Sequence, residues 1–388
     1  MSGSTDLLDN VRIREVRSRA DRRAYLDLVR EPYHDNPSWV HPDVRILKGV
    51  LRGRTWLAKR AERRALIAVQ DDKPVACMTA FVHASFEEKL GKKIGTIGFF
   101  EALPGHEQAV DALFRDAERW LQSRKVTRIW GPMNGHIMYG FGCLENRYGE
   151  RPVVGSAYNL PDYPGHWWRN HYKHAPSFYS YAVDLTREQT RASIDTALDN
   201  PRLAREPAIR LRKSDLGSWR REVGIFIDLH NGAFVENWGD TPLSHEEIWE
   251  LMGLARFTTD PELFWIAEID GRPVGLVLCM PDLNEAFARV HAEPASLRAG
   301  LALLRFGRKV RRGGLFVIGV LKEARGRGLA ETLAARAMKR MIARGMTEME
   351  YCLVLEDNIP SQRVARRFGG EQTKTYLMFE KVLSYIQA

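Results

Sequence analysis

Residues 317–333 read VIGVLKEARGRGLAETL, and their character changes twice along the stretch. A β-branched apolar run ends near Leu321, two glycines stand at positions 326 and 328, and the residues after them favour a helix. Glycine costs roughly 1 kcal/mol relative to alanine inside a regular element, so a pair of glycines here needs a reason. The stretch predicts a strand, a bare turn and a helix, and a turn without any ligand is one explanation for it.

A pattern of secondary structure occurs twice in the chain. Residues 64–81 (RALIAVQDDKPVACMTAF) and 263–280 (LFWIAEIDGRPVGLVLCM) each read as two strands joined by a tight polar turn. Residues 97–134 and 318–358 each read as a strand, a turn, a helix and a strand that leads to an asparagine. The shared order predicts a duplicated α/β domain, although two hairpins can look alike by chance.

The two copies differ at the turn before their long helix. The first copy reads EALPGHEQA at 101–109, with a proline and one glycine, whereas the second reads EARGRGLAE at 323–331. Residues 186–206 between the copies are polar with a helical pattern, and they read as a linker. We expect that only the second copy keeps a ligand-binding turn.

Composition and charge limit the kinds of protein that the chain can be. Its 388 residues suit two domains, and its four cysteines lie far apart, which argues against a disulfide framework or a zinc site. The formal charge of +9 indicates an anionic partner, such as nucleic acid, anionic lipid or a phosphate-bearing cofactor. The start of the sequence lacks the features of a signal peptide, and no apolar run reaches a membrane-spanning length. We expect a cytoplasmic protein.

The glycine turn has the features of a phosphate site. A helix that starts directly after glycines offers unpaired N–H groups and the positive end of its dipole, which suit a pyrophosphate. Arg325 and Arg327 add positive charge beside these groups. The sequence has neither the lysine of a nucleotide-hydrolysing phosphate loop nor the three-glycine dinucleotide fingerprint, so those two classes fit poorly.

The run from Arg325 to Ala330 resembles the coenzyme A pyrophosphate loop of the GCN5-related N-acetyltransferase (GNAT) family, whose pattern is Arg/Gln-x-x-Gly-x-Gly/Ala. The resemblance implies acyl-CoA as co-substrate and no metal. It also implies that backbone groups of the strand pair with the pantetheine arm, and that an asparagine after the next strand holds this arm. The cofactor-binding residues implied in this way are Val320, Leu321, Arg325, Gly326, Arg327, Gly328, Leu329, Ala330 and Asn358.

The resemblance covers residues 207–388 strongly and residues 10–185 in a degenerate form. It implies an α/β fold (an α+β mixed sheet) with two tandem GNAT-like acyl-CoA N-acyltransferase domains. We predict a degenerate domain at 10–185 without the pyrophosphate loop, a linker at 186–206 and a catalytic domain at 207–388. The whole layout, including the segments GPMN, AYNLPDYPG and FVENWGDTPLSHEEI, resembles a bacterial group of tandem acyltransferase-like proteins that includes the bacterial ceramide synthases.

The implied reaction is attack of an amine on the thioester, and a base must take the proton of the amine. Each base candidate is also open to a structural reading, as a solvated turn residue or a satisfied polar residue on a helix. The sequence departs from the family at Ala365, where many members carry a tyrosine that protonates the thiolate, so Tyr376 or water is the expected acid. The base candidates are Glu356, Asp357, Glu236 and His230.

Two basic amphipathic segments indicate a lipidic substrate. Residues 296–314 (SLRAGLALLRFGRKVRRGG) place Arg298, Arg305, Lys309 and Arg312 on one face of a predicted helix with leucines over much of the rest, and residues 44–64 are a second candidate. Such helices can lie on an anionic membrane, although a solvated basic face over a buried apolar one has the same pattern. Peripheral contact with the inner membrane surface is therefore an alternative to a free cytoplasmic position.

The aromatic and histidine-rich stretch at 158–181 is open to several interpretations. Its histidines lack a carboxylate or cysteine at ligand spacing, so a metal site is a poor fit. The rings suit an interdomain surface, an acyl pocket or the core. Stacking of single-stranded nucleic acid uses a similar mix, but no RNA-binding signature accompanies it, and we expect no nucleic-acid partner.

The function predicted from the sequence is N-acylation with acyl-CoA as donor. The preferred substrates are a long-chain acyl group and the amine of a sphingoid-base-like lipid. An acetyl-CoA-dependent N-acetyltransferase of a small amine or peptide is the rival enzyme. A non-catalytic membrane-binding or nucleic-acid-binding module is the rival from another class, and the intact glycine turn argues against it.

Overall fold

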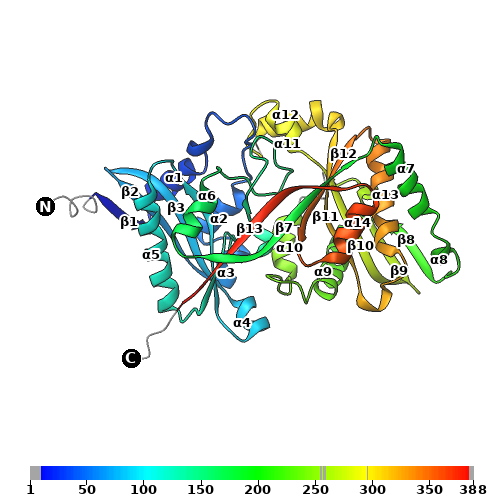
Figure 1. Cartoon of the computed structure of the whole chain (residues 1–388), viewed down its shortest axis with the longest axis horizontal. Coiled ribbons are helices and arrows are strands. Elements are labelled where there is room, and N and C mark those ends of the chain that lie inside the picture. Colours follow the sequence, from blue (N-terminus) through cyan, green and yellow to red (C-terminus); the bar gives the residue numbers. More distant parts are fainter. Residues whose placement is uncertain (1–9, 254–255, 257–258, 295, 384–388) are drawn as a thin grey trace. The chain divides into compact units, whose positions relative to one another are not determined.

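The computed structural model describes residues 10–253, 256, 259–294 and 296–383, which form a mixed α/β structure (Figure 1). The chain divides into two compact units. The prediction of an α/β fold with mixed sheets is confirmed. Unit 1 consists of Met1–Glu150, Ala157–Ser177 and Tyr376–Ala388, and unit 2 consists of Arg151–Ser156 and Phe178–Thr375.

The units are discontinuous in sequence because two long strands, β7 (Lys173–Asp184) and β13 (Glu371–Val382), each contribute residues to both. The segment 186–206, predicted as a linker, forms the helices α7 (Glu188–Leu198) and α8 (Pro201–Ala204) and belongs to unit 2. The compact units therefore differ from the predicted domain limits at both of these places.

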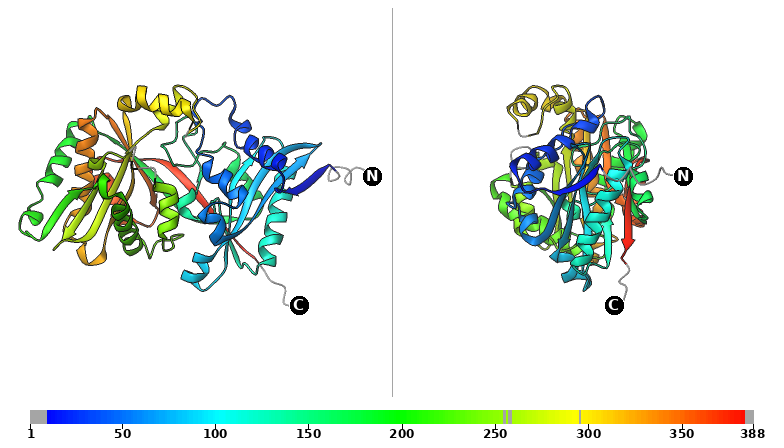
Figure 2. Two further views of the ribbon diagram at one scale, coloured as in Figure 1. Left: turned by 180° about the vertical axis from the view of Figure 1, so that it is seen from behind. Right: turned by 90° about the vertical axis from the view of Figure 1, so that its left-hand side faces the viewer.

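Unit 1 has the strand order β1-β2-β3-β4-β5-β13, and apolar side chains lie on both faces of its sheet. Leu66 and Met78 pack in the core beneath α5, whereas Ile67 and Cys77 pack in the core beneath α1 and α2 (Figure 2). The strands are β1 (Val11–Glu15), β2 (Ala61–Gln70), β3 (Lys73–His83), β4 (Ile94–Ala102), β5 (Arg128–Gly131) and β6 (Cys143–Leu144). The helices are α1 (Arg19–Leu28), α2 (Arg45–Arg52), α3 (Trp56–Arg60), α4 (Ala84–Leu90), α5 (Glu107–Ser123) and α6 (Tyr163–Arg169).

Unit 2 has the strand order β7-β12-β11-β10-β9-β8. Helix α13 covers one face and α9 the other, because a Cβ added at Gly275 of β10 would meet Leu333 of α13, and one added at Gly319 of β11 would meet Ala233 of α9. The strands are β8 (Ile209–Lys213), β9 (Phe264–Ile269), β10 (Arg272–Pro281), β11 (Arg312–Val320) and β12 (Glu348–Leu355). The other helices are α9 (Trp219–Ala233), α10 (His245–Met252), α11 (Asn284–Ala288), α12 (Leu297–Phe306), α13 (Leu329–Ala343) and α14 (Ile359–Arg367).

The two basic segments fold differently from one another. Residues 44–64 form α2, α3 and the start of β2, and the side chains of Leu47, Leu51 and Leu57 are all at least 92% buried, so this segment is a basic surface over core. In residues 296–314 the helix ends at Phe306 and Arg312 already begins β11, so the predicted basic face is shorter than expected. Within the described residues, no helix is both long and apolar enough to cross a membrane.

Candidate active site

The parallel strands β11 and β12 pair over only four residues and then diverge. Arg312–Leu315 pair with Glu348–Tyr351, and the remainders of the two strands are not paired with each other. Each strand has an irregularity directly after the paired part: Phe316 is an extra residue in the register with β10, and Leu353 adopts φ 53° where the register with β7 shifts. A β-bulge bends a strand, and a left-handed leucine costs roughly 1–2 kcal/mol, so the backbone itself separates the strands.

The part of β11 beyond the bulge presents backbone groups to the gap between the strands. Leu321 donates its N–H to the carbonyl of Val274 at 2.8 Å, so the backbone groups of Leu321 point toward β10. In an antiparallel pair the direction alternates, and the N–H groups of Ile318 and Val320 therefore face the gap. The sequence analysis named Val320 and Leu321 and missed Ile318, which the alternation along the strand could have found.

The glycine turn joins β11 to α13, as predicted. Gly326 and Gly328 have φ values of 82° and 75°, a region that glycine enters without strain. Gly326 is exposed, and a Cβ added there would meet nothing within 4 Å. In the described structure α13 has no side-chain N-cap, so the N–H groups of its first turn are available to a ligand.

Residues of the predicted linker hold the carbonyl side of this turn. Asn200 donates from Nδ2 to the carbonyl of Arg327 at 3.0 Å, and Arg202 donates to the carbonyl of Gly326 at 2.6 Å. Glu206 pairs with Arg327 at 3.0 Å. The sequence analysis missed these three residues, because nothing in a polar segment of this kind shows which distant loop it will contact.

The two arginines of the turn also support its structure. Arg325 donates from Nε to the carbonyl of Val320 at 3.1 Å and from a terminal nitrogen to the carbonyl of Ala233 at 3.4 Å. The charge of Arg327 is balanced by Glu206, whereas Arg325 donates to carbonyl groups of the described residues. Arg325 therefore keeps a net positive charge beside the exposed glycine.

The C-terminal end of α9 lies against the diverging part of β11. A Cβ added at Gly319 would lie 3.0 Å from Ala233 and 3.0 Å from the ring of Phe234. Four residues later the ring of Trp238 lies 6.4 Å from the ring of Phe178 of β7, the strand that pairs with β12. Residues 234–238 therefore run from the β11 side of the gap to the β12 side, and they carry Glu236.

The base candidates lie around this gap. Glu356 is half-buried after β12, Asp357 beside it is exposed, and Glu236 is exposed on residues 234–238. His230 is 6% exposed on α9, and burial lowers its pKa to about 4, so its imidazole is uncharged at neutral pH but is a weak base. Its Nε2 lies 3.9 Å from Oδ1 of Asp240, a partner that the sequence analysis did not name.

Tyr376, one of the two expected acids, lies on β13. It is fully buried, it belongs to unit 1, and it pairs with Leu144 of β6. Ala365 is a residue of α14 (Ile359–Arg367) and is buried in the core of unit 2. Asn358 is the N-cap of the same helix, where its Oδ1 accepts from the N–H of Ser361 at 3.1 Å.

Rings of the aromatic stretch pack into the core of unit 1. Trp167 is fully buried and stacks on Phe379 with ring centroids 5.5 Å apart, and Tyr163 is 3% exposed. His166 is buried among these rings, which lowers its pKa. Of the interpretations that the sequence left open, core packing is correct for Tyr163 and Trp167. No group of three potential ligands is placed to hold a metal among the residues that the structure describes.

Unit 1 has a similar gap, and its own chain fills it. Its parallel strands β4 and β5 pair over three residues only, from Ile94 to Thr96 on β4. Beyond them the N–H of Phe99 donates to Oδ1 of Asn134 at 2.7 Å, and a Cβ added at Gly98 would lie 2.3 Å from the carbonyl oxygen of Met133. The chain itself therefore occupies the space beside β4, and the degenerate character of the first domain stays a prediction.

The chain is similar to several known proteins. Residues 225–370 match the family model described as the acetyltransferase (GNAT) family. The chain is 26% identical over 376 residues to a protein of Caulobacter vibrioides named bacterial ceramide synthase. The matched region covers 95% of this chain and 96% of that protein. It is 23% identical to protein YghO of Escherichia coli over 95% of each chain. Among solved structures, a tandem GNAT protein from the clavulanic acid biosynthesis pathway matches with a TM-score of 0.59 and 13% identity, over 97% of this chain and 99% of the other.

Diverging parallel strands, an open glycine turn and these matches define the class of the protein, which is an N-acyltransferase. Residues 225–370 are similar to the GNAT family, and the chain as a whole has a tandem GNAT fold, as the sequence predicted. Enzymes of this family take acetyl-CoA or another acyl-CoA as co-substrate.

Gly326→Asp tests the assignment of the glycine turn. A carboxylate at this position would repel a pyrophosphate and would strain a left-handed backbone, so we expect the affinity for coenzyme A to fall by about 100-fold or more. Gly345→Asp is the matched control, because Gly345 has φ 80° and open space around it at the other end of α13. Isothermal titration calorimetry measures both variants. Equal affinity of the two variants would show that the turn does not hold the coenzyme.

His230 predicts a dependence of stability on pH. Its pKa is lowered from 6.5 to about 4 in the folded protein, so the unfolded chain binds the proton more readily between these values. The free energy of unfolding is therefore unaffected by this group above pH 6.5. Between pH 6.5 and pH 4 it falls by on the order of 3 kcal/mol. His230→Gln should reduce this fall in denaturant titrations at pH 4.5 and 7.5, whereas His245→Gln, which removes an exposed imidazole from α10, should not. Identical curves for the two variants would contradict the prediction.

Proposed function

We propose that the protein transfers a long-chain acyl group from acyl-CoA to the amine of a lipid-like acceptor such as a sphingoid base. The proposal of acyl transfer from acyl-CoA rests on the open glycine turn at the end of the gap between β11 and β12. The lipid part is supported by the similarity to the Caulobacter protein along almost the whole of both chains. The exposed leucines of α12 also support it, since a lipid substrate requires access to a bilayer.

In the proposed complex the coenzyme enters along β11. Its pyrophosphate lies on the N–H groups that follow Gly326, and the charge of Arg325 adds to the positive end of α13. The pantetheine arm pairs with the backbone of Ile318 and Val320 like an added strand. The thioester then lies near the bulge at Phe316, where a backbone N–H can stabilise the developing oxyanion.

The acceptor amine attacks the thioester carbonyl from the side of α9. A bond forms between nitrogen and the carbonyl carbon, the carbon–sulfur bond breaks, and a water molecule passes the second proton of the nitrogen to the departing thiolate. The base must first remove a proton from the ammonium group, and Glu356, Asp357, Glu236 and His230 remain the candidates. Glu356 is our first choice because it directly follows β12 at the open end of the gap and is half-buried.

Glu356→Gln tests this choice. Removing the carboxylate should lower kcat by about 100-fold, the usual contribution of a general base, and leave the affinity for coenzyme A unchanged. Glu246→Gln changes an exposed glutamate on α10 in the same way and should behave like the wild type. If Glu356→Gln keeps full turnover, then Glu236→Gln and His230→Gln are the next variants to measure.

The proposed substrates are tested by incubating the protein with an equimolar mixture of acetyl-CoA and palmitoyl-CoA and with sphinganine, a polyamine or a peptide. Mass spectrometry should find N-palmitoyl-sphinganine as the main product. Acetylation of the polyamine or peptide alone would replace the proposal with a small-amine N-acetyltransferase. No product from any pair, together with binding of vesicles or nucleic acid, would indicate a non-catalytic module.

A further inference from the structure

Helix α12 has its apolar side chains arranged opposite to those of an ordinary surface helix. Ala299 and Ala302 face inward and are each 2% exposed. Leu297, Leu301 and Leu304 are 90%, 65% and 84% exposed. These leucines are spaced by four and three residues, so they form one continuous stripe along the outer face. Large apolar residues gathered on an outer face in this way mark a surface that another body covers.

The surroundings of the leucine stripe are positively charged. Every charged residue between Glu293 and Glu323 is an arginine or a lysine. Arg298 and Arg305 are exposed beside the stripe, and Arg308 and Lys309 are exposed directly after the helix. Figure 1 shows α12 beside α11, away from the helices α9 and α13 that cover the sheet of unit 2. The body that covers the stripe must therefore combine an apolar interior with anionic groups at its surface.

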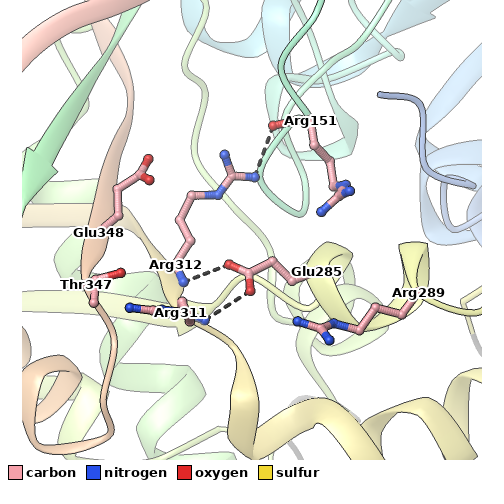
Figure 3. A pocket seen from close by; sticks show the side chains of 7 residues that line it. All are labelled: Arg151, Glu285, Arg289, Arg311, Arg312, Thr347 and Glu348. Carbon is pink, nitrogen blue, oxygen red and sulfur yellow. Dashed lines mark hydrogen bonds between the residues drawn. The ribbon is translucent and has the colours of Figure 1, made fainter. Parts of the chain in front are cut away.

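A pocket rich in arginine adjoins this helix (Figure 3). It has a volume of about 450 Å³, and the guanidinium group of Arg289 lies 5.3 Å from the ring centroid of Phe306 of α12. Its glutamate Glu285 accepts the backbone N–H groups of Arg311 and Arg312, at 3.0 and 2.8 Å. The lining residues are Arg151, Glu285, Arg289, Arg311, Arg312, Thr347 and Glu348.

We infer that α12 lies in the surface of an anionic phospholipid bilayer. The three leucines insert among the acyl chains, the flanking arginines lie at the level of the phosphates, and the arginine pocket takes a phosphodiester headgroup. The inference extends the proposed function, because it places the enzyme where a lipid amine is available. The membrane contact itself needs neither acyl-CoA nor catalysis.

A second copy of the chain fits this surface less well. Three leucines expose on the order of 300 Å² of apolar surface, whereas a stable dimer buries roughly 800 Å² on each partner. Two copies would also bring their basic flanks together without an acidic counterpart. An anionic bilayer has no such size limit and supplies the opposite charge.

A fluorescent label at position 301 tests the insertion directly. The four native cysteines are all buried, so a thiol introduced by Leu301→Cys is the exposed one that an environment-sensitive dye will modify. Vesicles of phosphatidylglycerol and phosphatidylcholine should shift the emission of this dye to the blue, and vesicles of phosphatidylcholine alone should not. The same dye at Leu90→Cys, an exposed leucine of α4 that is 42% accessible, should show no shift.

Flotation with vesicles then measures the contribution of each part. Replacing Leu297, Leu301 and Leu304 with serine should lower binding to anionic vesicles at least tenfold, and Leu90→Ser should not. Arg289→Gln combined with Arg311→Gln should reduce the preference for phosphatidylglycerol, and binding of the wild type should weaken as salt rises. An unchanged triple-serine variant, or a dye shift caused by protein concentration without vesicles, would overturn the inference, the latter in favour of a dimer.

Two variants separate this inference from the proposed function. Gly326→Asp should float with vesicles like the wild type although it no longer binds coenzyme A. The triple-serine variant should bind coenzyme A like the wild type although it no longer floats. If vesicle binding is lost only in Gly326→Asp, the membrane contact belongs to the coenzyme site and the role of α12 is wrong.

Discussion

The divergence of β11 and β12 is the constraint on which the rest of the site depends. Parallel pairing ends at Leu315, and the two strands then bend apart at Phe316 and Leu353. A gap of this kind leaves backbone donors of β11 without a neighbouring strand, a state that costs free energy unless water or a ligand satisfies them. An extended arm that carries a carbonyl or amide every few atoms is a suitable partner. The glycine turn lies at the end of the same strand, so one ligand can use both features.

The turn is held mainly through its carbonyl side. Asn200 and Arg202, far away in the sequence, bind the carbonyl groups of Arg327 and Gly326. Arg325 fastens the turn to β11 and to the end of α9. With its carbonyl groups occupied in this way, the turn can direct its N–H groups to solvent, which is preorganisation for an anion rather than flexibility.

The two copies of the repeat differ in what lies in the gap between their parallel strands. Each copy leads from its second parallel strand to an asparagine. Asn134 of unit 1 accepts from the N–H of Phe99 and occupies the gap, whereas Asn358 of unit 2 accepts from the N–H of Ser361 and caps α14. The same residue type thus closes one gap and leaves the other open, because the backbone after the strand takes a different path.

The sequence by itself determined the strand, glycine turn and helix at 317–333, the two-copy α/β pattern and the copy that keeps the turn, because these features follow from the preferences of neighbouring residues. Tertiary structure decided which residues support the turn and that Tyr376 is buried in unit 1. It also decided that residues 44–64 cover a core while the leucines of α12 face outward. These outcomes depend on contacts between distant positions, such as Asn200 and Arg327, which lie 127 residues apart. The sequence pattern of a helix or strand shows which of its faces are apolar. Only tertiary packing decides which face is buried and which residues it contacts.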